Sequence, residues 1–235
     1  MILRQALRRV LPPRLALALR QRWLVRRVVT QAGGLEGEIQ LLPRFVRPTD
    51  VCWDIGANAG TYALALSRLA SRVLAFEPVP HNVDILEGVK KRARLDNVTI
   101  QRVAVGDTDG PGRMTIPIDG FYGGYYLAAL DDEGQLEVSV ASVDGLIARA
   151  LPEPDFLKCD VEGAERRVIN GARALIARRH PIWLLETFED DILPLMRSLG
   201  YLAHVHVGNG NIEQVQAREI THRNYLFLPA ADAVD

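Results

Sequence analysis

Cysteine is scarce in this 235-residue chain, where only Cys52 and Cys159 occur. Both fall inside short apolar runs that are predicted to be buried strands, so neither a disulfide framework nor a cysteine-rich zinc site is indicated. No apolar run reaches the length of a membrane span, and Arg14, Arg20 and Arg22 interrupt the N-terminus too often for a signal peptide. We therefore expect a cytoplasmic protein in a reducing compartment.

The chain also has almost no net charge, since 28 basic and 29 acidic residues give a formal charge of −1. This balance gives no basis for a nucleic-acid partner. A hydrophobic fraction of 48% is ample for the core of one sizeable α/β domain. Homo-oligomerisation is left open by the sequence.

Charge is nevertheless uneven along the chain. Residues 1–30 contain eight arginines and no acid, and Pro12-Pro13 divides them into two short helical pieces. One interpretation is a basic amphipathic arm that contacts anionic lipid or an acidic partner. The favoured one is a pair of helices packed on the domain with their arginines in solvent. We treat 1–46 as a basic helical N-terminal extension and 47–235 as the main domain.

Short apolar runs alternate with helical patterns through most of that domain. This alternation predicts a doubly wound, mostly parallel sheet, because parallel strands need crossover helices. Helices are expected over 61–69, 80–94, 162–178 and 190–199. The seven predicted strands cover the start of 51–60, then 72–76, 98–105, 155–160, 181–186, 201–207 and 224–228.

Residues 106–141 do not follow this alternation of apolar runs and helical patterns. Seven glycines punctuate short runs there, which predicts an antiparallel hairpin or an irregular insertion. Its tip, FYGGYY at 121–126, is aromatic and suits either a substrate lid or an ordinary exposed turn.

The stretch 51–60, VCWDIGANAG, predicts a buried strand that ends in a glycine turn before a helix beginning at Thr61. Gly56 and Gly60 allow positive φ and close backbone approach to a ligand. The dinucleotide fingerprint G-x-G-x-x-G fails, because Asn58 and Thr61 occupy its second and third glycine positions. A phosphate loop fails too, because no lysine follows Gly60.

Two acids then narrow the choice of ligand. Asp54, two residues before the first glycine, suits a cation such as an amino group or a sulfonium. Glu77 ends the second strand, where it can accept hydrogen bonds from both ribose hydroxyls of a nucleoside. Together they predict S-adenosyl-L-methionine as the cofactor. A nicotinamide-dependent oxidoreductase would also use Glu77 on a ribose, and a non-catalytic binding or scaffold protein with this fold is the other open alternative.

Candidate catalytic side chains lie at the end of the strand predicted at 155–160. In an extended segment Lys158, Asp160 and Glu162 project to one face, at the same sheet edge as the glycine turn. If the predicted cofactor donates its methyl group to a hydroxyl, the protein must align the acceptor oxygen and remove its proton. Asp160 or Glu162 is the favoured base or orienting group, Lys158 is a neighbouring cation, and His81 is an alternative base.

A divalent metal is a further, less favoured possibility. Asp160 and Glu186 each end a predicted strand, so magnesium or calcium could bridge them and an acceptor's hydroxyls.

Five segments occur in a characteristic order and spacing: DIGANAG at 54–60, FEPVPHN at 76–82, VAVGD at 103–107, DFLKCDVEGAE at 155–165 and LLE at 184–186. In this order they resemble the FkbM-type methyltransferases, within the class I group that depends on S-adenosylmethionine. The resemblance implies a Rossmann-like sheet of seven strands with helices on both faces. It also implies methyl transfer, most often to a hydroxyl of a sugar, glycan or secondary metabolite.

The same resemblance assigns the cofactor site. It implies that Glu77 contacts the ribose and that Val103 and Ala104 frame the adenine, although many class I enzymes carry an acid where Ala104 stands. Thr61, at the start of the helix, completes the predicted cofactor-binding set. The residues implied for the methionine part are Asp54, Gly56, Asn58 and Gly60.

Overall fold

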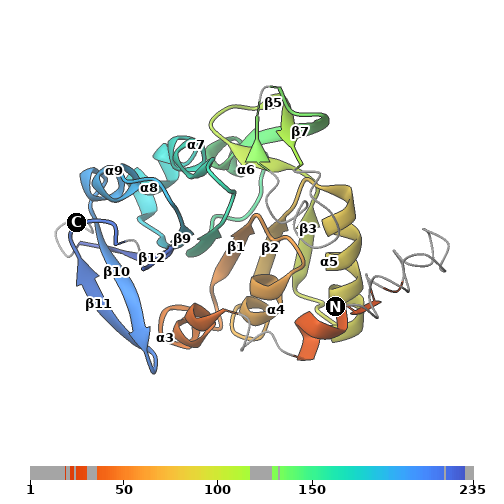
Figure 1. Cartoon of the computed structure of the whole chain (residues 1–235), viewed down its shortest axis with the longest axis horizontal. Helices are drawn as coiled ribbons and strands as arrows, with labels where there is room; N and C mark the ends of the chain where they lie inside the picture. Colours follow the sequence, from red (N-terminus) through yellow and green to blue (C-terminus); the bar gives the residue numbers. More distant parts are fainter. Residues whose placement is uncertain are drawn as a thin grey trace, which may run out of the picture.

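The computed structural model describes residues 36–116, 129–131, 133–219 and 221–230, together with 19, 22–23 and 25–30. An eight-stranded sheet runs through the centre of the molecule (Figure 1), in the order β11-β10-β12-β9-β8-β1-β2-β3. The strands from β9 to β3 are parallel, whereas β12 is antiparallel to both of its neighbours. Their bounds are β1 Val51–Ile55, β2 Arg72–Phe76, β3 Val98–Gln101, β8 Phe156–Cys159, β9 Ile182–Glu186, β10 Tyr201–Gly208, β11 Asn211–Val215 and β12 Asn224–Pro229.

Helices cover both faces of this sheet, as expected for parallel strands buried on two sides. Successive residues of β1 pack on opposite faces: Cys52 joins the cluster under α4 and α5, and Trp53 joins the cluster under α7, α8 and α9. The first face carries η1 Gly37–Leu41, α3 Leu42–Phe45, α4 Thr61–Ser67 and α5 Pro80–Ala93, and the second carries α6 Val143–Ala148, α7 Glu165–Asn170, α8 Arg173–Arg179 and α9 Ile192–Ser198. The predicted Rossmann-like α/β fold is therefore confirmed.

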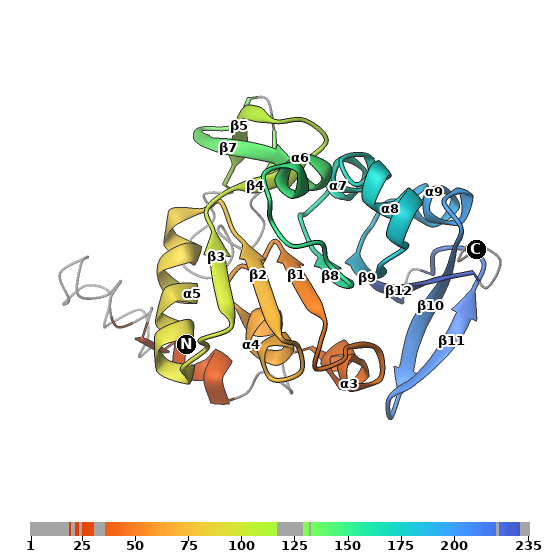
Figure 2. The same cartoon turned by 180° about the vertical axis from the view of Figure 1, so that it is seen from behind.

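A second, four-stranded sheet stands beside the carboxyl ends of β1, β2 and β3 (Figure 2). It has the order β4-β7-β5-β6, and β5 and β7 form the antiparallel pair expected within 106–141. The aromatic tip at 121–126 lies outside the described residues. The bounds are β4 Ala104–Gly106, β5 Gly110–Thr115, β6 Ala129–Leu130 and β7 Leu136–Ser142.

The single strand predicted at 98–105 is two strands in two sheets. β3 ends at Gln101 beside β2, and Ala104 then pairs with Val140 of β7. The chain turns at residues 102–103, where it passes from the main sheet to the second sheet. An apolar run in the sequence does not indicate such a change of sheet.

The helix predicted at 162–178 is also divided, and it starts later than expected. Glu162 and Gly163 adopt positive φ, so α7 begins only at Glu165. Gly171 lies between α7 and α8. Only glycine fits there, because a Cβ would lie 2.0 Å from the Gly106 carbonyl oxygen. The Asp144 carboxylate then accepts the Ala174 and Leu175 amides at 2.8 and 2.9 Å, which begins α8.

The eighth strand of the main sheet, β11, was not among the seven predicted. Gly208, Asn209 and Gly210 all adopt positive φ and turn β10 back into β11 as a hairpin. Asn-Gly is a strong hairpin signal, and the turn-rich segment expected at 208–211 leads directly into the strand that was not predicted. Helix α6 was also not predicted; Ser142 caps it by accepting the Gly145 amide at 3.0 Å.

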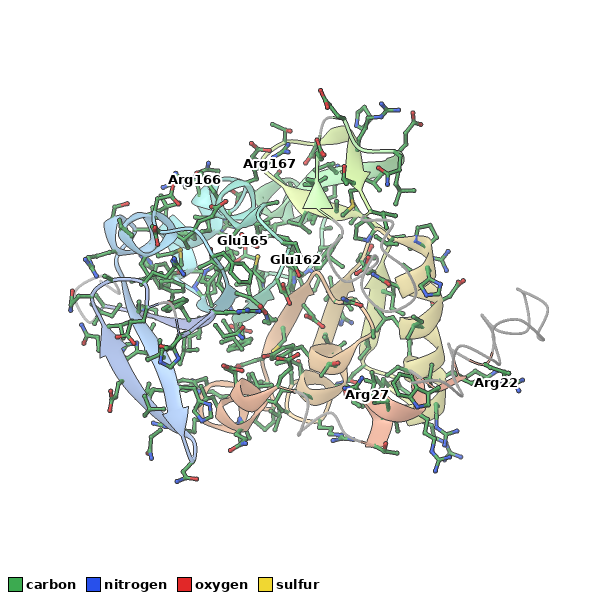
Figure 3. The ribbon with its side chains drawn as sticks, in the orientation of Figure 1. Arg22, Arg27, Glu162, Glu165, Arg166 and Arg167 are labelled. Carbon is green, nitrogen blue, oxygen red and sulfur yellow. The ribbon has the colours of Figure 1, made fainter. Side chains whose placement is uncertain are left out.

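The N-terminal segment contacts the domain where it is described. Residues 25–30 are helical, and Val28 is only 3% exposed within the core cluster on the α4 and α5 face. Gly88 of α5 makes room for this helix, because a Cβ there would lie 2.8 Å from Val25 Cγ2. Arg22 and Arg27 are exposed on the same segment (Figure 3). None of the described helices is long and apolar enough to cross a bilayer.

Candidate active site

The glycine turn after β1 is held between the two neighbouring strands. The amides of Gly56 and Ala57 both donate to the Phe76 carbonyl at 3.0 Å, and the Asp160 amide donates to the Ile55 carbonyl at 3.0 Å. Gly56 has a φ of 78°, and a Cβ there would lie 1.8 Å from the Asp160 carbonyl oxygen. Only glycine fits this position, because any side chain would separate the turn from the end of β8.

Gly60 differs from Gly56 in its structural role. Its φ of 88° starts α4, and a Cβ would lie 2.4 Å from Leu86 Cδ1 of α5. Gly60 therefore permits helix packing, and it is not among the residues that line the adjoining cavity. Asn58 is also at positive φ, and its backbone N–H donates a hydrogen bond to Glu77 Oε2 at 2.8 Å. This bond connects the turn to the end of β2.

A cavity of about 380 Å³ opens next to this turn, at the carboxyl ends of β1, β2, β8 and β9. It brings together most of the side chains singled out from the sequence. His81, by contrast, is on α5 and is not among its lining residues. The predicted site residues that line it are Asp54, Gly56, Asn58, Thr61, Glu77, Val103, Ala104, Lys158, Asp160, Glu162 and Glu186.

Glu77 is buried, with 4% of its surface exposed, and both of its oxygens accept backbone hydrogen bonds. Oε2 accepts from Asn58 and Oε1 accepts from the Val79 amide at 2.8 Å. Burial raises the pKa of Glu77 to about 7, against the effect of these bonds. The carboxyl group thus fixes the loop around it while it faces the cavity.

Asp54 and Lys158 are cross-strand partners in the register of β1 and β8, and both are 1% exposed. Burial raises the pKa of Asp54 to about 7, although the Lys158 charge opposes the shift. Burial also acts against the charge of Lys158, but attraction to Asp160 and Glu186 outweighs it and leaves the lysine pKa raised. Lys158 is therefore a cation, with Nζ 3.6 Å from Asp160 Oδ2 and 4.9 Å from the ring centroid of Tyr62.

Glu162 reaches the cavity through a turn rather than an extended strand. Because β8 ends at Cys159 and Glu162 has a φ of 51°, the expected alternation of Lys158, Asp160 and Glu162 on one face does not continue through Glu162. Burial raises the pKa of Glu162 to about 7, with repulsion from Asp160 and Glu165 adding to the effect.

The buried Glu165 carboxylate holds this turn, since it accepts the amides of Val161 at 3.3 Å and Gly163 at 3.1 Å. Figure 3 shows Glu162 and Glu165 beside the carboxyl end of the central strands.

Several lining residues were not anticipated from the sequence. Among them, Arg27 and Glu36 come from the N-terminal extension, and Tyr62 comes from the first turn of α4. Neither residue of the extension has a motif that could have marked it, whereas Tyr62 follows Thr61 directly. Six acids and two bases line the cavity, so it carries an excess of negative charge: the acids are Glu36, Asp54, Glu77, Asp160, Glu162 and Glu186, and the bases are Arg27 and Lys158.

The metal alternative receives no support from the geometry. No three His, Cys, Asp or Glu side chains within the described ranges are arranged to hold a metal ion. Asp160 is paired with Lys158, although it does share the cavity with Glu186.

Together the fold and the cavity define an α/β protein with a cavity beyond the carboxyl ends of its parallel strands, the place where such folds bind ligands. The family model of the methyltransferase FkbM domain matches residues 54–203, and the chain belongs to this family of methyltransferases. This membership favours methyl transfer over the nicotinamide-dependent alternative.

Two curated relatives and one solved structure illustrate the family. Hexuronic acid methyltransferase AglP of Haloferax volcanii is 32% identical over 144 residues, covering 59% of this chain and 56% of that protein. The 31-O-demethyl-FK506 methyltransferase FkbM of Streptomyces tacrolimicus is 30% identical over 196 residues, covering 66% and 74%. A methyltransferase FkbM from Methylobacillus flagellatus shares the fold with a TM-score of 0.53 and 17% identity, covering 88% and 58%. The chain thus spans little more than half of the first of these relatives.

Proposed function

We propose that this protein is an S-adenosylmethionine-dependent O-methyltransferase whose acceptor is a hydroxyl of a sugar, glycan or secondary metabolite. The observation that carries the proposal is the buried pair Asp54 and Glu77, which face one cavity from either side of the Gly56 turn. The names of the two curated relatives, a hexuronic acid methyltransferase and a 31-O-demethyl-FK506 methyltransferase, support the acceptor class.

The cofactor would occupy the part of the cavity next to the glycine turn. Glu77 would accept hydrogen bonds from the ribose hydroxyls through the lone pairs that its bonds to the backbone and to the Asn82 side chain leave free. Asp54 would lie near the positively charged methionine part, and Val103 and Ala104 would border the adenine. The excess of acids over bases in the lining suits a sulfonium ion.

In the reaction, a lone pair of the acceptor oxygen would form the new C–O bond as the S–CH₃ bond breaks. The sulfur would leave as the neutral thioether of S-adenosylhomocysteine, and the hydroxyl proton would pass to a carboxylate. We assign this role to Glu162, whose raised pKa of about 7 makes it a stronger base than an ordinary glutamate. Asp160, held by Lys158, would orient the acceptor.

Titration calorimetry with S-adenosylhomocysteine tests the cofactor assignment. We expect binding of micromolar order by the wild type and none by Gly56→Arg, because a side chain there overlaps the end of β8. Gly208→Arg is the matched control: Gly208 also has positive φ, but a Cβ there would meet no atom within 4 Å. If the folded wild type fails to bind S-adenosylhomocysteine, the proposed function is wrong.

A further inference from the structure

Beyond the acids that line the cavity, an aromatic side chain and an arginine lie together where β9 and β12 meet. We propose that Phe188 and Arg223 form an acceptor subsite that binds the ring of an uncharged sugar. This inference rests on the proposed function and names the acceptor class of the same site.

Phe188 is unusual because it is half exposed in a region where the backbone is fixed. Its side chain is 50% exposed, and the Arg223 guanidinium carbon lies 4.9 Å from its ring centroid. The fully buried Thr187 donates its amide to the Arg223 carbonyl at 2.9 Å, which joins the end of β9 to the start of β12. The aromatic ring is therefore presented to solvent by a rigid base.

Two relationships connect this pair to the cavity. Glu186, two residues before Phe188, lines the cavity and pairs in register with Asn224, the residue after Arg223. The positive charge of Arg223 lowers the pKa of Glu162, which lines the same cavity. Phe188 and Arg223 are not among the lining residues, but they adjoin Glu186 and so form a rim beside the cavity at the end of β9.

The chemistry of this rim matches a sugar ring. A pyranose has an apolar C–H face that can pack on an exposed aromatic side chain, and hydroxyl groups around its edge. The carboxylates of Glu162 and Glu186, which line the cavity, can accept hydrogen bonds from those hydroxyls. The hydroxyl to be methylated would then face Glu162.

Charge decides between a neutral sugar and a uronic acid. Six acids and two bases line the cavity, so a sugar carboxylate would enter a field of its own sign. Lys158 is already paired with Asp160, and the Arg223 guanidinium lies over the Phe188 ring. The subsite therefore selects against an anionic acceptor.

The test uses the full chain saturated with S-adenosylhomocysteine, with p-nitrophenyl glucoside and p-nitrophenyl glucuronide as matched probes in saturation-transfer NMR titrations. We expect the glucoside to bind at least tenfold more tightly than the glucuronide. Phe188→Ala should weaken glucoside binding about tenfold and leave S-adenosylhomocysteine binding unchanged. Arg223→Ala should weaken it less, and Arg223→Lys should restore part of the loss, because a lysine can also lie over the ring.

Two exposed residues provide matched controls, Val207 at 44% exposed and Arg102 at 69% for its side chain. Val207→Ala and Arg102→Ala should bind the glucoside as the wild type does. Equal or tighter binding of the glucuronide, an unchanged glucoside affinity in Phe188→Ala, or no binding of either probe would overturn the subsite. Since cofactor-product binding is measured in the same samples, failure of the subsite is distinguishable from failure of the methyltransferase assignment.

Discussion

Lys158 and Asp160 form an ion pair in which the two partners are unequally buried. Lys158 Nζ lies 3.6 Å from Asp160 Oδ2, but the lysine side chain is 1% exposed and the aspartate side chain is 33% exposed. The positive charge of Lys158 also offsets the negative charges of Asp54 and Glu186. Asp160, by contrast, is only one of several acids around the lysine. Loss of the cation should therefore cost more than loss of its closest partner.

We accordingly predict that Lys158→Met lowers the free energy of unfolding by about 3 kcal/mol, the lower end for a broken buried pair because Asp160 is partly solvated. Asp160→Asn should cost clearly less, since Asp54 and Glu186 still face the lysine. Urea unfolding at pH 7 measures both values, and the double variant gives their coupling. Equal losses in the two single variants would show that Lys158 compensates Asp160 alone.

The close approach at Gly56 gives a second prediction. Gly56→Ala should destabilise the protein by about 3 kcal/mol or more, because left-handed strain adds to the overlap with the Asp160 carbonyl. Gly208→Ala has the strain without the overlap and should cost about 1–2 kcal/mol. The difference in thermal unfolding between the two variants measures the cost of the overlap beyond that of the left-handed strain. Similar losses at both positions would mean that the turn moves away from β8 at little cost.

The sequence predicted the part of the site that rests on local pattern. The strand at Val51, the glycine turn and Glu77 lie within thirty residues of each other, and parallel topology places their ends at one edge. The later acids were also located, because Asp160 directly follows β8 and Glu186 ends β9, and both strands join that edge.

The sequence could not predict contributions that depend on tertiary contacts. Glu36 lines the cavity from the start of η1, which packs against β10 far along the chain: a Cβ at the neighbouring Gly37 would lie 3.6 Å from His206 Nδ1. The break between β3 and β4 depends on pairing with Val140 of β7, which no local pattern encodes. Glu162 was identified, but its left-handed conformation follows from the hydrogen bonds of Glu165.

The buried acids predict how stability depends on pH. Asp54 has an ordinary pKa of 3.8 and a folded value of about 7, and Glu77 is raised from 4.5 to about 7. Because the folded protein keeps these protons after the unfolded chain has released them, stability should fall as pH rises from about 4 to 7. Thermal unfolding of the ligand-free protein across this range should show a declining midpoint. Asp54→Asn should flatten the decline, and an unchanged slope would contradict the assignment.

The N-terminal extension offers a test between a packed helix and a membrane-binding arm. If residues 25–30 stay packed in solution, Val28→Asp should lower the free energy of unfolding by about 3 kcal/mol, because it places a charge in a site that is 3% exposed. Val207→Asp, at a site 44% exposed, should cost less than about 0.5 kcal/mol. Urea unfolding compares them. Equal stability of the two variants, with arm-dependent pelleting on anionic liposomes, would favour the membrane-binding interpretation.

The proposed base predicts how the reaction rate depends on pH. Glu162 must be ionised to accept the hydroxyl proton, and burial together with repulsion from Asp160 raises its pKa to about 7. With any acceptor that the enzyme methylates, kcat should rise between about pH 6 and 8 and then level off. Glu162→Gln should lower kcat by roughly 10²–10⁴-fold and leave binding of S-adenosylhomocysteine intact. Asp160→Asn, the control carboxylate, should raise KM more than it lowers kcat. If it instead removes the rise with pH while Glu162→Gln keeps it, Asp160 is the base.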